Sequence, residues 1–232
     1  MKVKTLILGI GNLLWADEGF GIRCVETMDA LYEFDDSVEL MDGGTQGIYL
    51  VHHVQDADNL IVFDAIDYGL APGEVKVIRD DKVPNFMGSK KVSLHQTGFQ
   101  EVLSTAKLME SYPKNIVLIG VQPELIEDFG GSLTPKVEAQ LENCIEIAVE
   151  IVKGWGINVI KRPEPELSLV QKELDKTKYE QERPAEDVAL RVGDERVLVD
   201  EQFKLRDQPL HQGISNVKSV PIDGRKLFES KS

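Results

Sequence analysis

Residues 3–21, VKTLILGIGNLLWADEGFG, contain a buried strand, a glycine-rich turn and the start of a helix. Val3–Ile10 is a nearly continuous apolar run, which is typical of a strand covered on both faces. Asp17 and Glu18 follow the turn, immediately before Phe20–Leu31, where apolar residues recur at helical spacing. A strand that leads through a short turn into a helix is the first unit of an α/β domain.

The same alternation of strand and helix continues to about residue 160. Further strands are expected at Val38–Met41, Asn59–Asp64, Val75–Arg79 and Asn115–Val121. Helices are expected at Gly47–Val54, at Gly98–Met109, and from a Thr134 cap to about Lys153. The pattern predicts an α/β fold with a mainly parallel, five-stranded sheet, whose ligands bind at the carboxyl ends of the strands.

Residues 161–232 have a different character and are expected to form a C-terminal extension. Lys161–Glu166 (KRPEPE) looks like a linker after an α/β domain that spans residues 1–160. Val188–Val192 and Arg196–Asp200 alternate around a short turn and predict a β-hairpin. The alternative is a partly disordered extension, because the chain is polar from residue 208 onward.

Charge argues against polyanionic partners. The 232 residues include 40 acidic and 26 basic ones, a net charge of −14, and residues 1–160 carry 25 of the acidic and 12 of the basic residues. A chain this acidic is a poor binder of nucleic acid or anionic membrane surfaces. No apolar run approaches the roughly 18 residues of a membrane span. We therefore expect neither a nucleic-acid nor a membrane partner.

The cysteines and the N-terminus favour a cytoplasmic protein. Cys24 and Cys144 both lie in predicted helices without a CxxC partner, which fits a reducing compartment. Lys2 and the apolar run after it superficially resemble a signal peptide. However, glycines interrupt the run and Asp17 follows it, so a buried strand is the better interpretation.

Gly9-Ile10-Gly11 invites a nucleotide-binding interpretation. The dinucleotide fingerprint needs a third glycine where Leu14 stands, and the acidic Asp17 and Glu18 fall where phosphates would sit. A nucleotide-binding α/β protein therefore stays a minor alternative. The structural interpretation is that the glycines shape a tight turn as the chain leaves the strand.

Three residues are candidates for a metal site: Glu18, Asp64 and His95. Taken alone, Glu18 beside Asp17 could complement a helix dipole, Asp64 could make an Asx turn, and His95 could be an incidental loop residue before the Gly98–Met109 helix. Taken together, all three are expected at one rim of the sheet. Two carboxylates and an imidazole suit a divalent metal with open coordination positions.

Several motifs in a fixed order carry a family resemblance. They are Ile7-Leu8-Gly9-Ile10-Gly11-Asn12, Asp17-Glu18-Gly19 with Gly21, Asp42-Gly43-Gly44-Thr45, Phe63-Asp64-Ala65, Ser93-Leu94-His95-Gln96, Ile119-Gly120-Val121-Gln122-Pro123-Glu124 and Leu133-Thr134-Pro135. Over about residues 3–160 the chain resembles the [NiFe]-hydrogenase maturation endopeptidases. That family clips the C-terminal extension from the precursor of the hydrogenase large subunit.

The resemblance implies a twisted sheet flanked by helices on both faces. It also implies that Glu18, Asp64 and His95 engage nickel, that the large-subunit precursor supplies this nickel, and that no nucleotide is bound. Asp42, Gly43 and Gly44 look like the family's second functional loop, in which the glycines let backbone approach the peptide. Asp42 would orient substrate or assist proton transfer, and its alternative is an ordinary turn acid.

The sequence thus predicts a cytoplasmic endopeptidase, active as a monomer, that cuts the precursor after nickel has been inserted. Nickel would either assist hydrolysis or only license recognition, and both roles stay open. The alternative from another class is a non-catalytic checkpoint chaperone that binds the nickel-loaded precursor without cutting it. A generic hydrolase acting on a peptide without nickel is a further alternative.

Overall fold

A five-stranded sheet in the order β3-β1-β4-β6-β5 forms the centre of the molecule. The computed structural model describes residues 3–84, 94–126, 131–166, 169 and 179. The strands are β1 (Thr5–Ile10), β3 (Val38–Gly44), β4 (Asn59–Ala65), β5 (Val75–Arg79) and β6 (Asn115–Val121). Strands β3, β1, β4 and β6 are parallel, and the edge strand β5 runs antiparallel to β6. The predicted class, a mainly parallel α/β fold, is confirmed.

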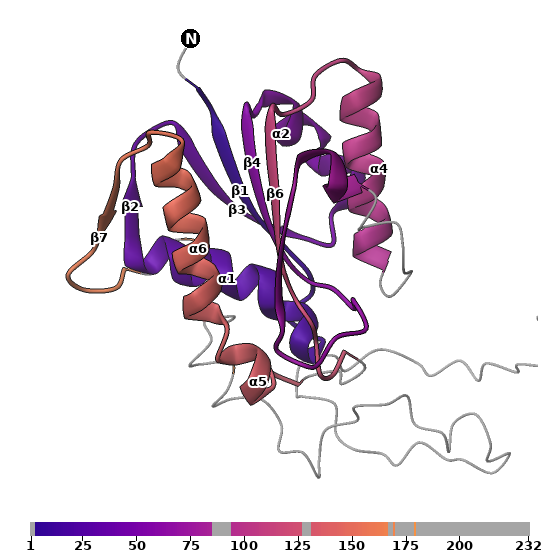
Figure 1. The fold of residues 1–232 in the computed structure, drawn as a ribbon, viewed down its shortest axis with the longest axis vertical. Helices are drawn as coiled ribbons and strands as arrows, with labels where there is room; N and C mark the ends of the chain where they lie inside the picture. The colour runs from indigo at the N-terminus through magenta and orange to yellow at the C-terminus, as the bar shows by residue number, and fades with distance from the viewer. Residues whose placement is uncertain (1–2, 85–93, 127–130, 167–168, 170–178, 180–232) are drawn as a thin grey trace, which may run out of the picture. The chain divides into compact units, whose positions relative to one another are not determined.

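Helices cover both faces of the sheet (Figure 1). They are α1 (Phe20–Leu31), α2 (Val51–Asp56), α4 (Leu94–Leu108), α5 (Pro135–Glu138) and α6 (Leu141–Gly154), with 3₁₀ turns η1 (Ala16–Gly19), η2 (Gly47–Leu50) and η3 (Asp80–Lys82). Helices α1, α5 and α6 pack on the face that carries Ile7 and Phe63, which we call the α1 face. Helices α2 and α4 pack on the face that carries Leu8 and Val62, the α4 face. Because both faces are covered, all of β1 and β4 is buried.

Glycines let α1 lie directly on the strands. A Cβ at Gly21 would come within 2.3 Å of the carbonyl oxygens of Ile10 and Phe63. A Cβ at Gly9 would lie 2.4 Å from the Gly21 oxygen. Gly11, with φ +144°, makes the tight turn out of β1 that the structural interpretation of these glycines predicts.

The helix predicted from Thr134 to Lys153 is wrong in its continuity, since α5 and α6 are separate helices. Thr134 takes the N-cap position of α5, but its side chain makes no capping hydrogen bond. The amphipathic helix predicted from Gly98 begins at Leu94 instead. His95 therefore lies in the first turn of α4 and not in the loop before it.

A second, two-stranded sheet lies at the far end of α1 from η1. The strands β2 (Tyr32–Phe34) and β7 (Val159–Lys161) pair antiparallel, and neither was predicted from the sequence. Both are only three residues long, too short for periodicity to reveal them.

Several described residues after β7 contact α1. Backbone N–H groups of Arg162 and Glu166 donate to the Leu31 and Ala30 oxygens, at 2.8 and 3.0 Å. Farther along, the ring of Tyr179 lies 5.9 Å from the Arg23 guanidinium carbon, near the start of α1. The predicted hairpin at 188–200 falls outside the described residues, and the domain boundary at residue 160 stays a prediction.

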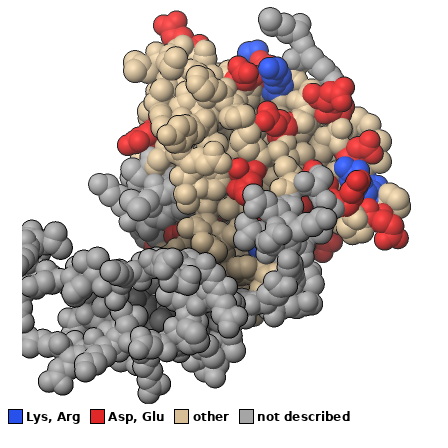
Figure 2. Space-filling view, turned by 180° about the vertical axis from the view of Figure 1, so that it is seen from behind, with Lys and Arg blue, Asp and Glu red and all other residues tan. Residues whose placement is uncertain are grey.

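On the face shown in Figure 2, acidic side chains are scattered, with few basic ones among them. The acidic side chains on this face are therefore not gathered into one patch. Within the described ranges, no helix is long and apolar enough to cross a membrane.

Replacing Gly21 with alanine tests the direct contact between α1 and the sheet. The new Cβ would meet backbone oxygens that cannot move without opening the sheet, so we expect Gly21→Ala to lower the free energy of unfolding by about 3 kcal/mol or more. Urea unfolding followed by circular dichroism measures this change.

Gly154→Ala is the matched control, because nothing lies within 4 Å of a Cβ at Gly154 in α6. It should leave stability unchanged or raise it by up to about 1 kcal/mol. Equal effects of the two substitutions would contradict the packing that we describe.

Candidate functional site

The carboxyl ends of β3, β1 and β4 bring the predicted site residues to one edge of the sheet. In the register, Gly9 of β1 pairs with Asp42 of β3 on one side and with Phe63 of β4 on the other. Asp64 therefore lies one residue further along β4 than the level of Asp42. We refer to this rim as the carboxyl edge. Parallel α/β sheets bind their ligands there because the connecting loops and helix starts gather at that rim.

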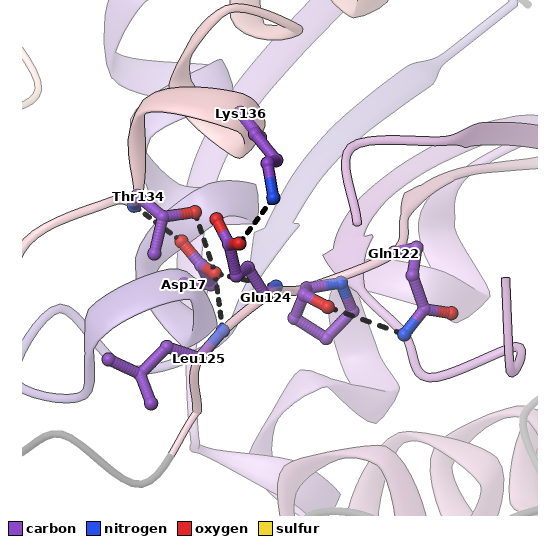
Figure 3. Close-up of polar contacts among 7 residues, drawn as sticks. Asp17, Gln122, Glu124, Leu125, Thr134 and Lys136 are labelled. Atoms are coloured by element: carbon purple, nitrogen blue, oxygen red, sulfur yellow. Dashed lines mark hydrogen bonds and ion pairs between the residues drawn. The ribbon is translucent and has the colours of Figure 1, made fainter. Parts of the chain in front are cut away.

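Asp17 ties the carboxyl edge together (Figure 3). Its buried carboxylate accepts hydrogen bonds from the backbone N–H groups of Glu124 and Leu125, both at 2.8 Å. It also accepts from the Thr134 N–H at 2.7 Å and from the Thr134 hydroxyl at 3.1 Å. In return, the Asp17 N–H donates to the Leu125 oxygen at 3.0 Å. One side chain thus joins η1, the segment after β6 and the start of α5.

Glu18 lies next to this junction and is half-buried. Its N–H donates to the Trp15 oxygen, and its own oxygen accepts from the Asn12 N–H at 3.0 Å. A Cβ at Gly11 would lie 1.8 Å from the Glu18 oxygen, so the η1 turn sits closely over the end of β1. The turn also contacts β4. Glu18 is therefore held at the carboxyl edge by backbone contacts.

Asp64 is fully buried at the end of β4. Side chains alternate along a strand, and Val62 and Ile66 belong to the α4 face. Asp64 therefore faces α4 as well. Burying a carboxylate costs free energy unless polar groups replace the water that it loses. An acid at this buried position is therefore expected to interact with a polar or charged group.

Asp42 faces the other way. Leu40, two residues earlier on β3, packs against the α1-face core, which places Asp42 on the α1 face. Its Oδ1 accepts the Gly44 N–H at 2.8 Å in an Asx turn. Asp42 as a residue is exposed, but neighbouring groups partly bury its carboxyl, and this partial burial raises the pKa of that carboxyl from its ordinary value of 3.8. The Gly44 N–H and the Arg23 charge oppose that rise.

A pocket of about 260 Å³ opens beside Asp42, lined also by Gly44, Thr45 and the Gly11–Leu14 turn. This pocket gives access to Asp42 and Gly44 at the end of β3. A pocket of similar size, lined by His52 and His53, lies at the opposite end of the sheet, by the start of β1.

The position of His95 follows from how α4 packs. Gly98 of α4 crosses Gly47 of η2 so closely that a Cβ at Gly98 would lie 3.3 Å from the Gly47 Cα. His95 comes three residues before Gly98, nearly one helical turn. The backbone of His95 therefore lies within about one helical turn of the place where α4 crosses Gly47, just after β3. The side chain of His95 is outside the described part of the structure.

The predicted metal site is consequently only partly visible. Glu18 lies in η1, over the turn that leaves β1, and Asp64 lies near the end of the neighbouring β4, while Asp42 is on the opposite face from Asp64. Among the side chains that the structure describes, no group of three His, Cys, Asp or Glu residues is arranged to hold a metal ion. The ligand set Glu18, Asp64 and His95 stays a prediction.

Residues 22–151 match the protein family described as hydrogenase maturation protease. The chain belongs to this family. It is 58% identical over 195 residues to the hydrogenase expression/formation protein HoxM of Azotobacter vinelandii, covering 84% of this chain and 94% of HoxM. It is 39% identical over 161 residues to the hydrogenase 2 maturation protease of Escherichia coli, covering 69% of this chain and 97% of that protein.

A solved structure shows the same fold. The hydrogenase maturating endopeptidase HybD from E. coli is 38% identical, with a TM-score of 0.66 over 69% of this chain and 98% of HybD. The predicted family and enzyme class, a hydrogenase maturation protease, are confirmed.

Sequence reasoning missed two residues of this maturation protease's site. Asp17 was expected to cap a helix or complement its dipole, but its carboxylate binds segments more than 100 residues away. Gln122 was quoted in a motif without a role. It is buried, and its side-chain oxygen accepts the N–H groups of Tyr68 and Leu70. For Gln122, the sequence signal was its position as a polar residue directly after the buried strand β6.

Asp17→Asn tests the role of the buried carboxylate. The amide keeps one acceptor oxygen but turns a donor towards backbone N–H groups, so several charge-assisted hydrogen bonds are lost. We expect the free energy of unfolding to fall by about 3–5 kcal/mol in urea titrations.

Asp56→Asn is the control for Asp17→Asn. Asp56 is exposed and forms an ion pair with exposed Lys4 at 3.6 Å, so its loss should cost less than about 1 kcal/mol. An Asp17→Asn effect as small as this would show that the carboxylate does not hold the edge together.

Asp42→Asn tests the raised pKa. A carboxyl whose pKa is raised on folding stabilises the protein below its ordinary pKa, and that contribution is lost as the pH rises through the folded-state pKa. Asparagine keeps the acceptor for Gly44 and cannot ionise. The melting temperature of Asp42→Asn should therefore match wild type near pH 3.5 and exceed it slightly at pH 7, by less than about 2 °C.

Asp42→Ala is the comparison, because it removes the acceptor for the Gly44 N–H as well. It should be less stable than Asp42→Asn at every pH. A wild-type protein that gains stability relative to Asp42→Asn as pH rises from 4 to 7 would contradict the assigned direction.

Proposed function

We propose that the protein is a nickel-dependent endopeptidase that removes the C-terminal extension of a [NiFe]-hydrogenase large-subunit precursor after nickel insertion. The observation that carries the proposal is the placement of Glu18 and Asp64, with the first turn of α4, at the carboxyl edge of a maturation-protease fold. The nickel belongs to the substrate. The protein would act in the cytoplasm as a monomer that contacts its partner transiently.

The three ligands would have distinct supports. Glu18 is presented by η1, which the Asp17 carboxylate fastens to the segment after β6. Asp64 is presented by the end of a fully buried strand. His95 comes from the first turn of α4. Carboxylate and imidazole ligands suit nickel, and three of them leave coordination positions for the groups that already hold the metal in the precursor.

The peptide would bind at Asp42, Gly43 and Gly44. Gly43 is buried against the Leu8 side chain, while Asp42 is exposed beside the pocket. The Asx turn to Gly44 fixes the carboxyl, whose pKa is raised by partial burial. A positioned carboxyl of this kind would assist proton transfer to or from the peptide. A metal ion near the scissile carbonyl would polarise that carbonyl or activate a water.

The test is to incubate the protein with precursor large subunit, with and without nickel. Nickel-loaded precursor should be shortened on a gel, and mass spectrometry should find the released peptide. Equal processing without nickel would contradict the nickel requirement. A stable complex in which the precursor keeps its full length would favour the checkpoint chaperone.

Single substitutions test the ligands. Glu18→Gln, Asp64→Asn and His95→Ala should each lower kcat/KM by at least about 100-fold, which corresponds to about 2.7 kcal/mol of transition-state stabilisation. His53→Ala and Glu33→Gln are matched controls, because both residues are exposed and lie away from the carboxyl edge. Normal cutting by all three variants would show that the assigned residues are not the site.

A further inference from the structure

Tyr68 lies on the loop that follows β4 and reaches back over the sheet. Its hydroxyl occupies the place of the missing side chain at Gly120, because a Cβ at Gly120 would lie 2.2 Å from that oxygen. Gly120 is on β6, the strand next to β4. A residue with any side chain at position 120 would push the phenol away.

The register puts this hydroxyl beside Asp64. Asp64 and Gly120 are paired residues of parallel β4 and β6, so their Cβ positions point to the same face. Neighbouring strands lie roughly 4.8 Å apart. The phenol that replaces a side chain at Gly120 therefore lies near the Asp64 carboxyl on the α4 face, although no hydrogen bond joins the Tyr68 hydroxyl to Asp64 in the described part of the structure. Burial and the Asp64 charge both raise the pKa of Tyr68.

Gln122 holds the loop in this position. Its Oε1 accepts the N–H of Tyr68 at 2.8 Å and of Leu70 at 3.1 Å. Its Nε2 donates to Asp67 Oδ1 at 3.0 Å. The Lys76 ammonium lies 5.1 Å from the centre of the Tyr68 ring. The backbone of Tyr68, its ring and the neighbouring Asp67 each have a described contact, and these contacts hold the loop that carries the phenol.

We propose that Tyr68 is a positioning residue for Asp64: its hydroxyl stabilises the charge of the carboxylate and, when Asp64 engages the substrate's nickel, donates to that carboxylate and so orients it. This inference rests on the proposed function, in which Asp64 engages the substrate's nickel. Groups that orient a ligating carboxylate typically change metal affinity or activity by 10–100-fold when they are removed. The phenol is suited to this task because it can donate to the carboxylate without competing for the metal.

Tyr68→Phe removes only the hydroxyl. With nickel-loaded precursor, we expect kcat to fall about 10-fold and KM to stay within twofold of wild type. Gly120→Ala should likewise lower kcat and leave KM nearly unchanged, because its Cβ displaces the phenol. Tyr112→Phe is the matched control: Tyr112 is half-buried near Asp80 and Asp81, at the opposite end of β6, and its pKa is also raised. Its kcat should be unchanged.

A double-mutant cycle gives a readout that does not need activity. The shift in urea midpoint caused by Tyr68→Phe should differ between the wild-type and Asp64→Asn backgrounds, since the hydroxyl acts on the charge that Asp64→Asn removes. The same shift in both backgrounds would overturn the inference. So would a Tyr68→Phe enzyme with wild-type kcat. If wild type itself leaves the precursor uncut, the proposed function fails, while the cycle still decides whether Tyr68 acts on Asp64.

Discussion

The carboxylate of Asp17 is the interaction on which the carboxyl edge depends. It is completely buried, and it accepts hydrogen bonds from the segment after β6 and from the start of α5. An ionised group in such a place is tolerated because backbone N–H groups replace the water that it lost. By satisfying these donors, Asp17 fixes the η1 turn and with it Glu18. Asp17, which is not expected to touch the substrate, therefore positions Glu18, which we expect to contact it.

Residues 122–125 connect the two sides of the proposed site. The backbone of Glu124 and Leu125 binds Asp17, while the side chain of Gln122 holds the loop that carries Tyr68. One short segment at the end of β6 thereby supports Glu18 through Asp17 and holds the loop of Tyr68, the residue that we propose acts on Asp64. In the proposed function, ligands that are placed in advance would need less ordering when the substrate arrives. On the α1 face, the charge of Arg23 lowers the pKa of Asp42.

The sequence predicted the fold better than it predicted the supports of the site. Continuous apolar runs such as Asn59–Asp64 identify buried strands without any knowledge of their neighbours, and the order of the motifs identified the family. The role of Asp17 was not predictable, because its partners lie more than 100 residues away in the chain and are backbone groups of ordinary residues. Tyr68 was missed for a related reason: only the register of β4 and β6 shows that a glycine makes room for its ring beside Asp64. The short strands β2 and β7 escaped because three residues carry no measurable period.

The most direct measurement is nickel X-ray absorption on the complex between the protein and its nickel-loaded precursor. We expect the coordination of the nickel to gain nitrogen and oxygen neighbours when wild-type protein binds. The nitrogen contribution should be absent with His95→Ala, and the oxygen contribution should shrink with Asp64→Asn. A nickel spectrum that is the same in free precursor and in the wild-type complex would contradict the claim that the carboxyl edge contacts the metal.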